Sequence, residues 1–292
     1  MTLEVLSPGP LATVQDLGRP GLAHLGVGES GAADRRSLRL ANRLVGNPEG
    51  AAALEATLGG LTVRFDTAVL VALTGAPCPL TVGGRGAAMY APLPVRAGET
   101  LQLGMPEAGL RTYLAVRGGI EVPCVLGSRS TDTMASLGPA PLSPATRLPV
   151  GAPTQPHPGV DIAPQAPYAS EIHLDVVLGP RDDWFTAEAL AALCLGPYTV
   201  TDRCDRVGIR LDGPLLTRRI ERELKPEATV AGALQVPPNG QPILFLADHP
   251  VTGGYPVIAA VTEDDLHLAA QARPGQRLWF RTTGRQRPRQ VG

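Results

Sequence analysis

Residues 240–261 have the sequence GQPILFLADHPVTGGYPVIAAV, in which two apolar runs enclose a polar loop. The runs, 242–247 and 257–261, are rich in β-branched and aromatic side chains, so they are predicted to be buried strands. The loop carries a carboxylate, an imidazole, a hydroxyl group and paired glycines, contributed by Asp248, His249, Thr252, Gly253 and Gly254. This composition predicts a ligand-binding loop, and the alternative interpretation is an ordinary polar hairpin tip.

The whole chain is predicted to be mainly β with short helices. Its 292 residues include 34 glycines and 30 prolines spread between short apolar runs, which favours many short strands joined by turns. Two β-barrel-like domains are the simplest architecture. The expected divisions are an N-terminal domain at 1–140 with a helical insertion near 33–56, a proline-rich linker at 141–168, a C-terminal barrel domain at 169–282 and a disordered tail at 283–292.

The helical insertion is predicted from side-chain periodicity. Over 33–45 the apolar residues Leu38, Ala41 and Leu44 share one face, and the arginines lie elsewhere on the helix. A second short helix is expected over 48–56.

Charge and hydropathy argue against several classes of partner. A net charge of −1, with the one basic cluster in the tail, predicts no nucleic-acid partner. No apolar run reaches the roughly 18 residues of a membrane span. The N-terminus lacks the features of a signal peptide, so we expect a cytoplasmic protein without membrane contacts. The cysteines are far apart and the histidines lack ligand spacing, so no metal site is predicted.

Lys225 is the only lysine in the chain. A phosphate-binding P-loop requires a Gly-Lys-Ser/Thr sequence, whereas this lysine lies between Leu224 and Pro226, so no P-loop is present. The same context differs from the Met-Lys-Met segment of a biotin carrier, so no covalent biotin is expected on this chain. A Schiff-base mechanism would have to use this one residue.

Several side chains are candidates for binding or catalysis. Asp248 is favoured over His249, because a carboxylate at the end of an apolar strand requires a partner. Arg206 is a natural bidentate partner for a substrate carboxylate or phosphate, with a surface salt bridge as the alternative. In the other half, a substrate-binding cleft is predicted from Arg129, Ser130, Gln15 and Asp16.

Residues 26–31 form a G-x-G-x-x-G pattern before the first predicted helix. A dinucleotide-binding fold requires a hydrophobic strand immediately before this pattern and a parallel strand after the helix, and neither is predicted here. A glycine loop leading into a helix N-terminus can still hold an anion on backbone N–H groups. Gly28, Ser30 and Gly31 are the candidate anion-binding residues.

Three separated segments resemble one known family. They are GPLATVQDLGRPGLAHLGVGESGAADRRSLRLANRLVGNPEGAAALE at 9–55, LAVRGGIEVPCVLGSRSTDT at 114–133 and GALQVPPNGQPILFLADHPVTGGYPVIAAV at 232–261. They are similar, in the same order, to the KipA family, which is also called the 5-oxoprolinase C-subunit family, allophanate hydrolase subunit 2 or the biotin-dependent carboxyltransferase family. The resemblance runs from residue 9 to about residue 280 and implies cyclophilin-like β-barrels.

The resemblance also implies an activity. The chain would be the C subunit of an ATP-dependent 5-oxoprolinase, which hydrolyses 5-oxo-L-proline to L-glutamate together with a KipI-like B subunit and a LamB/YcsF-like A subunit. ATP, with its Mg²⁺, would bind at a shared interface between subunits. Asp248, Arg206 and Tyr255 would act on the amide, and Thr252, Gly253 and Gly254 would bind substrate.

Two alternative functions remain open from the sequence. One is the carboxyltransferase component of a biotin-dependent urea or amide carboxylase, and the other is a non-catalytic antagonist of a KipI-like kinase inhibitor. The loop departs from the family pattern, because His249 and Pro250 stand where relatives often have Arg and Gln. A substrate other than 5-oxoproline is therefore also an expectation.

Overall fold

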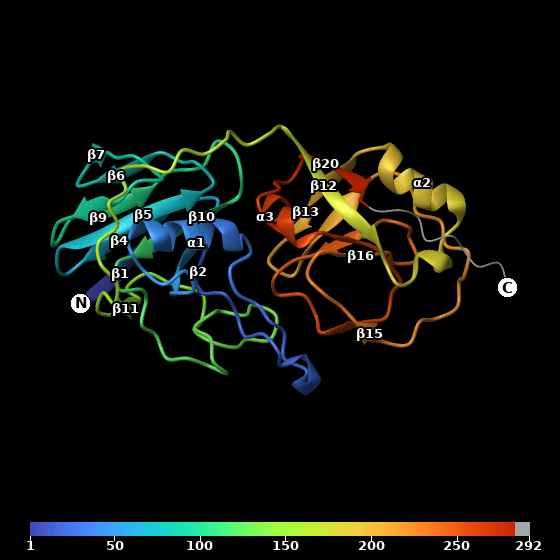
Figure 1. Cartoon of the computed structure of the whole chain (residues 1–292), viewed down its shortest axis with the longest axis horizontal. Coiled ribbons are helices and arrows are strands. Elements are labelled where there is room, and N and C mark those ends of the chain that lie inside the picture. Colours follow the sequence, from blue (N-terminus) through green and yellow to red (C-terminus); the bar gives the residue numbers. More distant parts are fainter. Residues whose placement is uncertain (284–292) are drawn as a thin grey trace.

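The structure of the chain, a computed structural model, describes residues 1–283 as two halves, each with its own apolar core. Figure 1 shows the halves side by side, joined by the segment that leads into β12 (Glu171–Leu178). The prediction of a mainly β chain with short helices is confirmed. Apart from residue 283, the tail expected at 283–292 lies outside the described residues. Within the described part of the chain, no helix is long and apolar enough to cross a bilayer.

The strands of the N-terminal half form two sheets around a shared core. The six-stranded sheet has the order β11-β1-β4-β9-β6-β7, with β1 (Thr2–Pro8), β4 (Leu61–Phe65), β6 (Leu80–Val82), β7 (Arg85–Gly86), β9 (Thr100–Leu103) and β11 (Arg147–Pro149). The five-stranded sheet has the order β2-β3-β10-β5-β8, with β2 (Leu11–Gln15), β3 (Ala53–Thr57), β5 (Val69–Gly75), β8 (Leu93–Val95) and β10 (Arg111–Val116).

Helix α1 (Arg35–Leu44) covers the outer face of the five-stranded sheet. Its apolar face, with Leu38, Ala41 and Leu44, packs on Ala72 of β5 and Ala115 of β10. Because the core lies on one face of β10 and α1 on the other, all six residues of that strand are buried. The helix predicted over 33–45 is confirmed by this arrangement.

The C-terminal half forms a closed barrel with the order β12-β19-β16-β17-β14-β13-β20. Its other strands are β13 (Tyr198–Cys204), β14 (Gly208–Asp212), β16 (Ala233–Gln235), β17 (Ile243–Phe245), β19 (Val257–Val261) and β20 (Arg277–Thr282). Strands β17 and β19 are the two apolar runs of residues 240–261, and both pair with β16. The polar loop between them is therefore not a hairpin tip. Within it, β18 (Thr252–Gly253) pairs with β15 (Glu227–Ala228).

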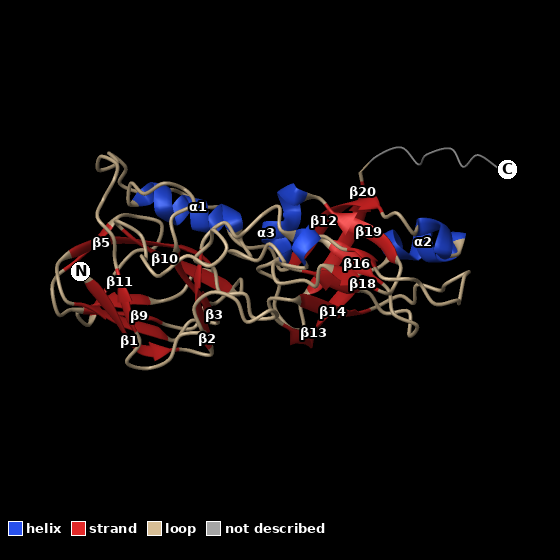
Figure 2. Cartoon of the chain, turned by 90° about the horizontal axis from the view of Figure 1, so that it is seen from below, coloured by secondary structure: helices blue, strands red, loops and turns tan. Residues whose placement is uncertain are grey.

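Short helices complete the C-terminal half. They are η2 (Asp182–Trp184), α2 (Ala187–Leu195), η3 (Glu263–Asp265) and α3 (Leu266–Ala269). The N-terminal half has the short helix η1 (Ala23–Leu25) in addition to α1. Figure 2 shows α3 where the two halves meet, and its residues contact α1. The chain thus places two helices from different halves next to one another at the seam, which is the interface between the two halves.

Two predictions are wrong, one about an element and one about a boundary. The second helix expected over 48–56 is replaced by strand β3, which pairs with β2 on one side and β10 on the other. The linker expected at 141–168 begins too early, because β11 within it pairs with β1 of the N-terminal sheet. The N-terminal half therefore extends past residue 140 to at least residue 149.

Candidate functional site

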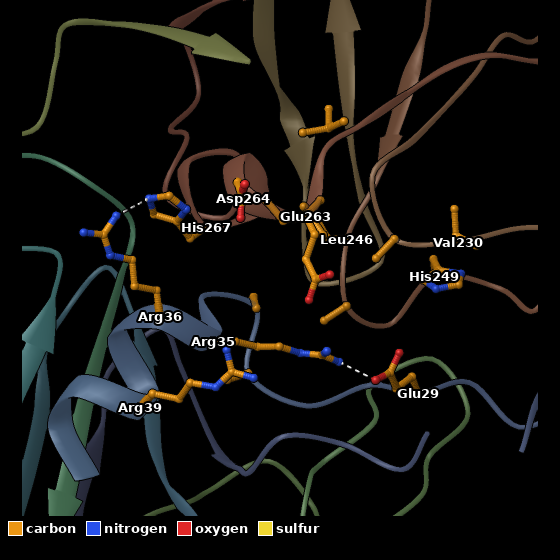
Figure 3. A pocket seen from close by; sticks show the side chains of 16 residues that line it. Glu29, Arg35, Arg36, Arg39, Val230, Leu246, His249, Glu263, Asp264 and His267 are labelled. Carbon is orange, nitrogen blue, oxygen red and sulfur yellow. Dashed lines mark hydrogen bonds and ion pairs between the residues drawn. The ribbon is translucent and has the colours of Figure 1, made fainter. Parts of the chain in front are cut away.

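A cavity of about 760 Å³ lies between the two halves. One wall is formed by the loop before α1 and by the first turns of α1, and the other by η3, α3 and the chain after β17 (Figure 3). The charged and imidazole side chains that line it are Glu29, Arg35, Arg36, Arg39, His249, Glu263, Asp264 and His267. Because both halves contribute, the shape of the cavity depends on how the halves are held together.

The wall formed by α1 is cationic. Arg35, Arg36 and Arg39 all reach the cavity, the first and last being one helical turn apart. The Nη2 atom of Arg35 lies 2.8 Å from an oxygen of Glu29. Arg36 reaches across the seam, where its Nη1 lies 3.3 Å from the Nε2 atom of His267 (Figure 3). This wall can bind a carboxylate or a phosphate.

The opposite wall is acidic. Glu263 and Asp264 belong to η3, and the side chain of Glu263 points into the cavity toward the arginines (Figure 3). Among residues 1–283, no ion pair joins either of these acids to an arginine of α1. Charges of opposite sign therefore face each other across open space that a small molecule can fill.

His249 lies on the wall of the large cavity and of a second cavity of about 200 Å³. Its Nδ1 atom lies 2.8 Å from the carbonyl oxygen of Pro250, and its ring stacks against Phe245 at 6.1 Å. A carbonyl oxygen can only accept, so this contact requires a proton on Nδ1, which also lies 3.2 Å from the hydroxyl of Thr229, and it leaves Nε2 available as an acceptor. His249 therefore offers a ring nitrogen that can accept a proton at this wall.

A buried ion triad joins the halves behind the cavity. The guanidinium of Arg206 donates to Asp248 through Nε and Nη2, both at 2.9 Å, and to Glu55 of β3 through Nη1 at 2.6 Å. Its Nη2 also donates to the carbonyl oxygen of Gly31 at 2.6 Å. Arg206 thus binds two carboxylates, one from each half, and a backbone carbonyl group.

Asp248 is held by the N-terminal half as well. Ser30 donates to one carboxylate oxygen at 2.7 Å, while the backbone and hydroxyl of Thr133 donate to the other at 2.9 and 2.7 Å. Asp248 is 2% exposed and Arg206 1%, and neither lines either cavity. Both groups are buried and fully hydrogen-bonded in this chain, so the catalytic roles predicted for them stay a prediction. In the structure, their contacts fix the chain leading to His249.

The triad is charged at neutral pH. Burial raises the pKa of the Glu55 carboxyl, but the charges of Arg206 and Arg111 outweigh burial and hold the pKa below its ordinary value. The same opposition of burial and Arg206 leaves the pKa of Asp248 lowered. For Arg206, burial is outweighed by the two carboxylates, which raise the pKa of the guanidinium. Each charge is stabilised by its partners.

Gln271 and Arg111 form a second buried contact across the seam. The Gln271 side chain accepts from the backbone N–H groups of Leu110 and Arg111, both at 2.8 Å, and donates to Asp34 at 2.8 Å. In the reverse direction, the Arg111 guanidinium donates to the carbonyl oxygen of Ala270. The residues next to α3 are thus bonded to β10 and to the N-cap of α1.

The residues of the cleft predicted around Asp16 hydrogen-bond to one another. The Asp16 carboxylate accepts from the hydroxyl of Ser128 at 2.6 Å, from the backbone of Arg129 at 2.6 Å and from the hydroxyl of Ser130 at 2.5 Å. Gln15 donates to the carbonyl oxygen of Thr131 at 2.9 Å. These contacts hold the 128–131 loop on β2, and none of the predicted residues lines either cavity.

The glycine loop at residues 26–31 contributes contacts between the two halves. Ser30 and Gly31 were predicted to bind an anion, but they contact Asp248 and Arg206 instead. Gly28 lines the second cavity. At the start of α1, Glu55 accepts from the backbone of Ala33 at 3.0 Å. A ligand anion at this helix end would meet that carboxylate and the Asp34 cap, so the anion-binding prediction is not supported.

The outer part of the polar loop lies away from the large cavity. Tyr255 is 43% exposed and lies against the guanidinium of Arg218, 5.7 Å from the ring centroid. Thr252 and Gly253 form β18, and a Cβ added to Gly253 would lie 2.4 Å from Nε2 of Gln235. None of residues 252–255 lines either cavity, so the substrate contacts predicted for them stay a prediction.

Apart from His249, which was considered as a candidate, the sequence argument missed the charged residues that line the cavity. The arginines of α1 were placed off the apolar face of the helix, without a partner wall to give them a role. Glu263 was not singled out, because only the packing of α3 on the seam brings η3 opposite α1. A signal was present for Glu55, since a carboxylate inside the apolar stretch AAALEAT requires a buried partner.

The chain is thus a two-part, mainly β protein, with a closed barrel next to a two-sheet half and a charged cavity between them. The chain belongs to the carboxyltransferase domain family, subdomain A and B, whose family model matches residues 25–282. It is 39% identical to the C subunit of 5-oxoprolinase from Escherichia coli (strain K12), over 95% of this chain and 90% of that protein. It is 33% identical to the C subunit of 5-oxoprolinase from Haemophilus influenzae, with the same coverage.

Longer proteins contain the same unit. The chain is 31% identical to urea amidolyase of Saccharomyces cerevisiae, over 95% of this chain and 16% of that protein. Among solved structures, the Kluyveromyces lactis urea amidolyase matches 96% of this chain with a TM-score of 0.89 at 30% identity. This chain spans only 18% of that solved chain, so the likeness concerns one part of a larger enzyme.

Proposed function

We propose that this chain is the C subunit of an ATP-dependent 5-oxoprolinase, which hydrolyses 5-oxo-L-proline to L-glutamate. The observation that carries the proposal is the 39% identity to the E. coli protein over 95% of this chain and 90% of the relative. A match over nearly the full length of both proteins supports the same role for this chain. A KipI-like B subunit and a LamB/YcsF-like A subunit are the proposed partners.

The proposed substrate site is the cavity at the seam. A lactam is a poor electrophile, and ATP, when bound, supplies the energy to activate its carbonyl oxygen. Within this chain, Arg35, Arg36 and Arg39 would stabilise negative charge on the ligand, and Nε2 of His249 would accept a proton from the attacking water. The carboxylates at the start of α1 do not fit a nucleotide phosphate there, so we propose that the phosphate groups are held with the partner subunits.

The test is reconstitution of the three subunits. The mixture should release glutamate and ADP from 5-oxo-L-proline and ATP, and the same mixture without this chain should not. His249→Gln should lower kcat by about 10²-fold or more, the usual contribution of a general base. If the mixture without this chain is equally active, the proposed function is wrong.

A second candidate is the carboxyltransferase component of a biotin-dependent carboxylase. The family match and the likeness to urea amidolyase favour it. Since Lys225 is the only lysine and lacks the carrier context, biotin would have to be carried by another chain. Transfer from carboxybiotin to urea, blocked by avidin, would support this candidate. Avidin-insensitive glutamate release would support the first.

A further inference from the structure

We propose that the second cavity, of about 200 Å³, binds the edge of a small planar amide. The carbonyl oxygen of the amide accepts from Nη1 of Arg19, and the N–H group on the same edge donates to Oδ2 of Asp132. This inference rests on the proposed function and deepens it, because it names the two side chains that would recognise the amide. Both lie outside the cationic wall of the large cavity.

Arg19 is a buried cation with one nitrogen unpaired. It is 2% exposed and lines the second cavity. Its Nε donates to the carbonyl oxygen of Val125 at 3.4 Å, and its Nη2 to that of Ser130 at 2.5 Å. Among residues 1–283, Nη1 has no hydrogen-bond partner. Because a buried donor without a partner costs free energy, this nitrogen favours a ligand that supplies an acceptor.

Asp132 offers the matching acceptor. Its Oδ1 accepts from the backbone N–H groups of Met134 and Ala135 at 3.0 and 2.9 Å. Its Oδ2 accepts no hydrogen bond from the described part of the chain and lies 4.0 Å from Nη1 of Arg19. This distance is too long for a direct hydrogen bond. A donor and an acceptor thus lie side by side without satisfying each other.

The 4.0 Å separation fits an amide whose oxygen and N–H group share one edge. Standard bond lengths place the oxygen and nitrogen of such an amide about 2.2 Å apart. Two hydrogen bonds of about 2.9 Å, splayed slightly outward, then join this edge to Nη1 and Oδ2. The ring of a lactam fixes this arrangement, and urea has it as well. Because the charges of Arg19 and Asp132 balance, the pair favours a neutral amide over an anion.

Gly28 leaves room beside this pair. It lines the second cavity, and a Cβ added to it would lie 3.8 Å from Oδ2 of Asp132 and 3.5 Å from the carbonyl oxygen of His249. The apolar residues of the lining are Leu22, Ala23, Val27, Val230, Ala231 and Val251. They suit the carbon side of a small ring, while the few polar groups fix its orientation.

The second cavity adjoins the large one. Glu29, Val230, Ala231 and His249 line both. Figure 3 shows three of these residues, Glu29, Val230 and His249, on the same side of the large cavity. The proposed amide site therefore belongs to the same region as the proposed substrate site.

Two ligands of the same shape test the role of Asp132. 2-Pyrrolidinone has the carbonyl oxygen and the N–H group on one edge, whereas γ-butyrolactone has a ring oxygen in place of the N–H group. Binding of each to the full chain would be measured by ligand-observed NMR and calorimetry. The wild-type chain should bind the lactam about 10-fold more tightly or better, because the lactone leaves Oδ2 unpaired against a second oxygen.

Asp132→Asn keeps the shape of the side chain. Because Oδ1 accepts from two backbone N–H groups, the asparagine would place its amide nitrogen where Oδ2 lies in wild type. A donor there cannot accept from the lactam N–H group, so the preference for 2-pyrrolidinone over γ-butyrolactone should disappear. A side chain that served only the fold would not change this ratio.

Gly28→Ala tests the position of the ligand without removing a hydrogen bond. The added methyl group fits the chain at ordinary contact distances but fills space beside Oδ2, so both ligands should bind about 10-fold more weakly or worse. In the reconstituted complex the same variant should raise KM for 5-oxo-L-proline. Gly86→Ala is the matched control, because a Cβ there meets nothing within 4 Å and Gly86 lines neither cavity. It should bind like wild type.

Other outcomes overturn the inference. If the wild-type chain shows no saturable binding of 2-pyrrolidinone, the pair holds ordered water only. An unchanged lactam preference in Asp132→Asn, or normal binding in Gly28→Ala, would place the ligand elsewhere. If the wild-type complex hydrolyses 5-oxo-L-proline and Gly28→Ala has a normal KM, the proposed function stands and this inference fails. If the complex is inactive, yet Asp132→Asn abolishes the lactam preference, this inference stands and the proposed function fails.

Discussion

The side chain of Asp248 is bound by Arg206, Ser30 and Thr133, so its charge is compensated on every side. Asp248→Asn keeps the size of the side chain but leaves the buried guanidinium with one carboxylate. Breaking a buried ion pair usually costs about 3–5 kcal/mol, and we expect a loss of this size in the free energy of unfolding. Urea denaturation followed by circular dichroism measures it.

The matched control for this variant is Arg64→Gln, which breaks an ion pair with Glu4 at the surface. Solvent screens that pair, so the denaturation midpoint should not move. If Asp248→Asn also left the midpoint unchanged, the ion triad would not hold the halves together.

Acid should weaken the same triad. The pKa of Glu55 is lowered in the folded chain from 4.5, and that of Asp248 from 3.8, so the folded state binds protons less readily than the unfolded state. Their contribution to stability is therefore complete above about pH 5 and is lost as the pH falls through the lowered pKa values. Glu55→Gln should flatten the fall in urea midpoint between about pH 6 and about pH 3 relative to wild type. An identical pH profile in the variant would contradict this expectation.

For single residues, the sequence identified Asp248 and Arg206 as candidates for the site without showing what they contact. Chemistry alone suggested that each needs a charged partner, but exposure decides whether that partner is a ligand or another side chain. Burial depends on how the two halves pack, and the local sequence does not encode that packing. Glu55 was missed for a related reason, because its alanine-rich surroundings favour helix until the sheet provides neighbours.

Among the elements, the loop before α1 requires glycine at one position. Gly31 has φ +90°, and a Cβ there would lie 2.7 Å from the backbone nitrogen of Gly18. Gly21 has φ +85°, but a Cβ there would meet nothing within 4 Å. Gly21→Ala should therefore cost only the left-handed backbone conformation, about 1–2 kcal/mol, and Gly31→Ala distinctly more. Thermal unfolding of the two variants compares them, and equal destabilisation would contradict the close backbone packing.

The strands were easier to predict than their partners. The apolar runs around the polar loop are β17 and β19. Pairing was not predictable in the same way, because β17 and β19 meet only through β16. Strand β11 was hidden for another reason, since its last residue is a proline within a proline-rich stretch. It lies at the edge of its sheet, where proline is tolerated.

For the whole molecule, the seam should make the two halves unfold together. One side chain, Gln271, bonds to Leu110, Arg111 and Asp34 of the other half. Gln271→Ala would leave several buried groups without partners, at about 1–3 kcal/mol for each. We expect faster amide exchange at Leu110 and Arg111 in this variant, measured by hydrogen–deuterium exchange.

Gln276→Ala is the control, because Gln276 donates to Ala169 at an exposed position on the same half. It should leave exchange at Leu110 and Arg111 unchanged. Equal protection in wild type and Gln271→Ala would mean that the seam is held by other contacts. The resemblance seen in the sequence predicted the family, but not this seam, because its contacts join residues more than 100 positions apart.

The Arg111 guanidinium has a further consequence for the order of events during synthesis. Its acceptors are the carbonyl groups of Asp205 and Ala270, which follow it by 94 and 159 residues. When β10 leaves the ribosome, its carboxylate partner Glu55, 3.6 Å from Nε of Arg111, has been translated, but the two carbonyl acceptors of the Nη1 and Nη2 groups have not. The first half must therefore wait with these N–H donors unsatisfied until the barrel is complete. A nascent chain arrested before Ala270 should be open to protease at β10, and one released after β20 should be resistant.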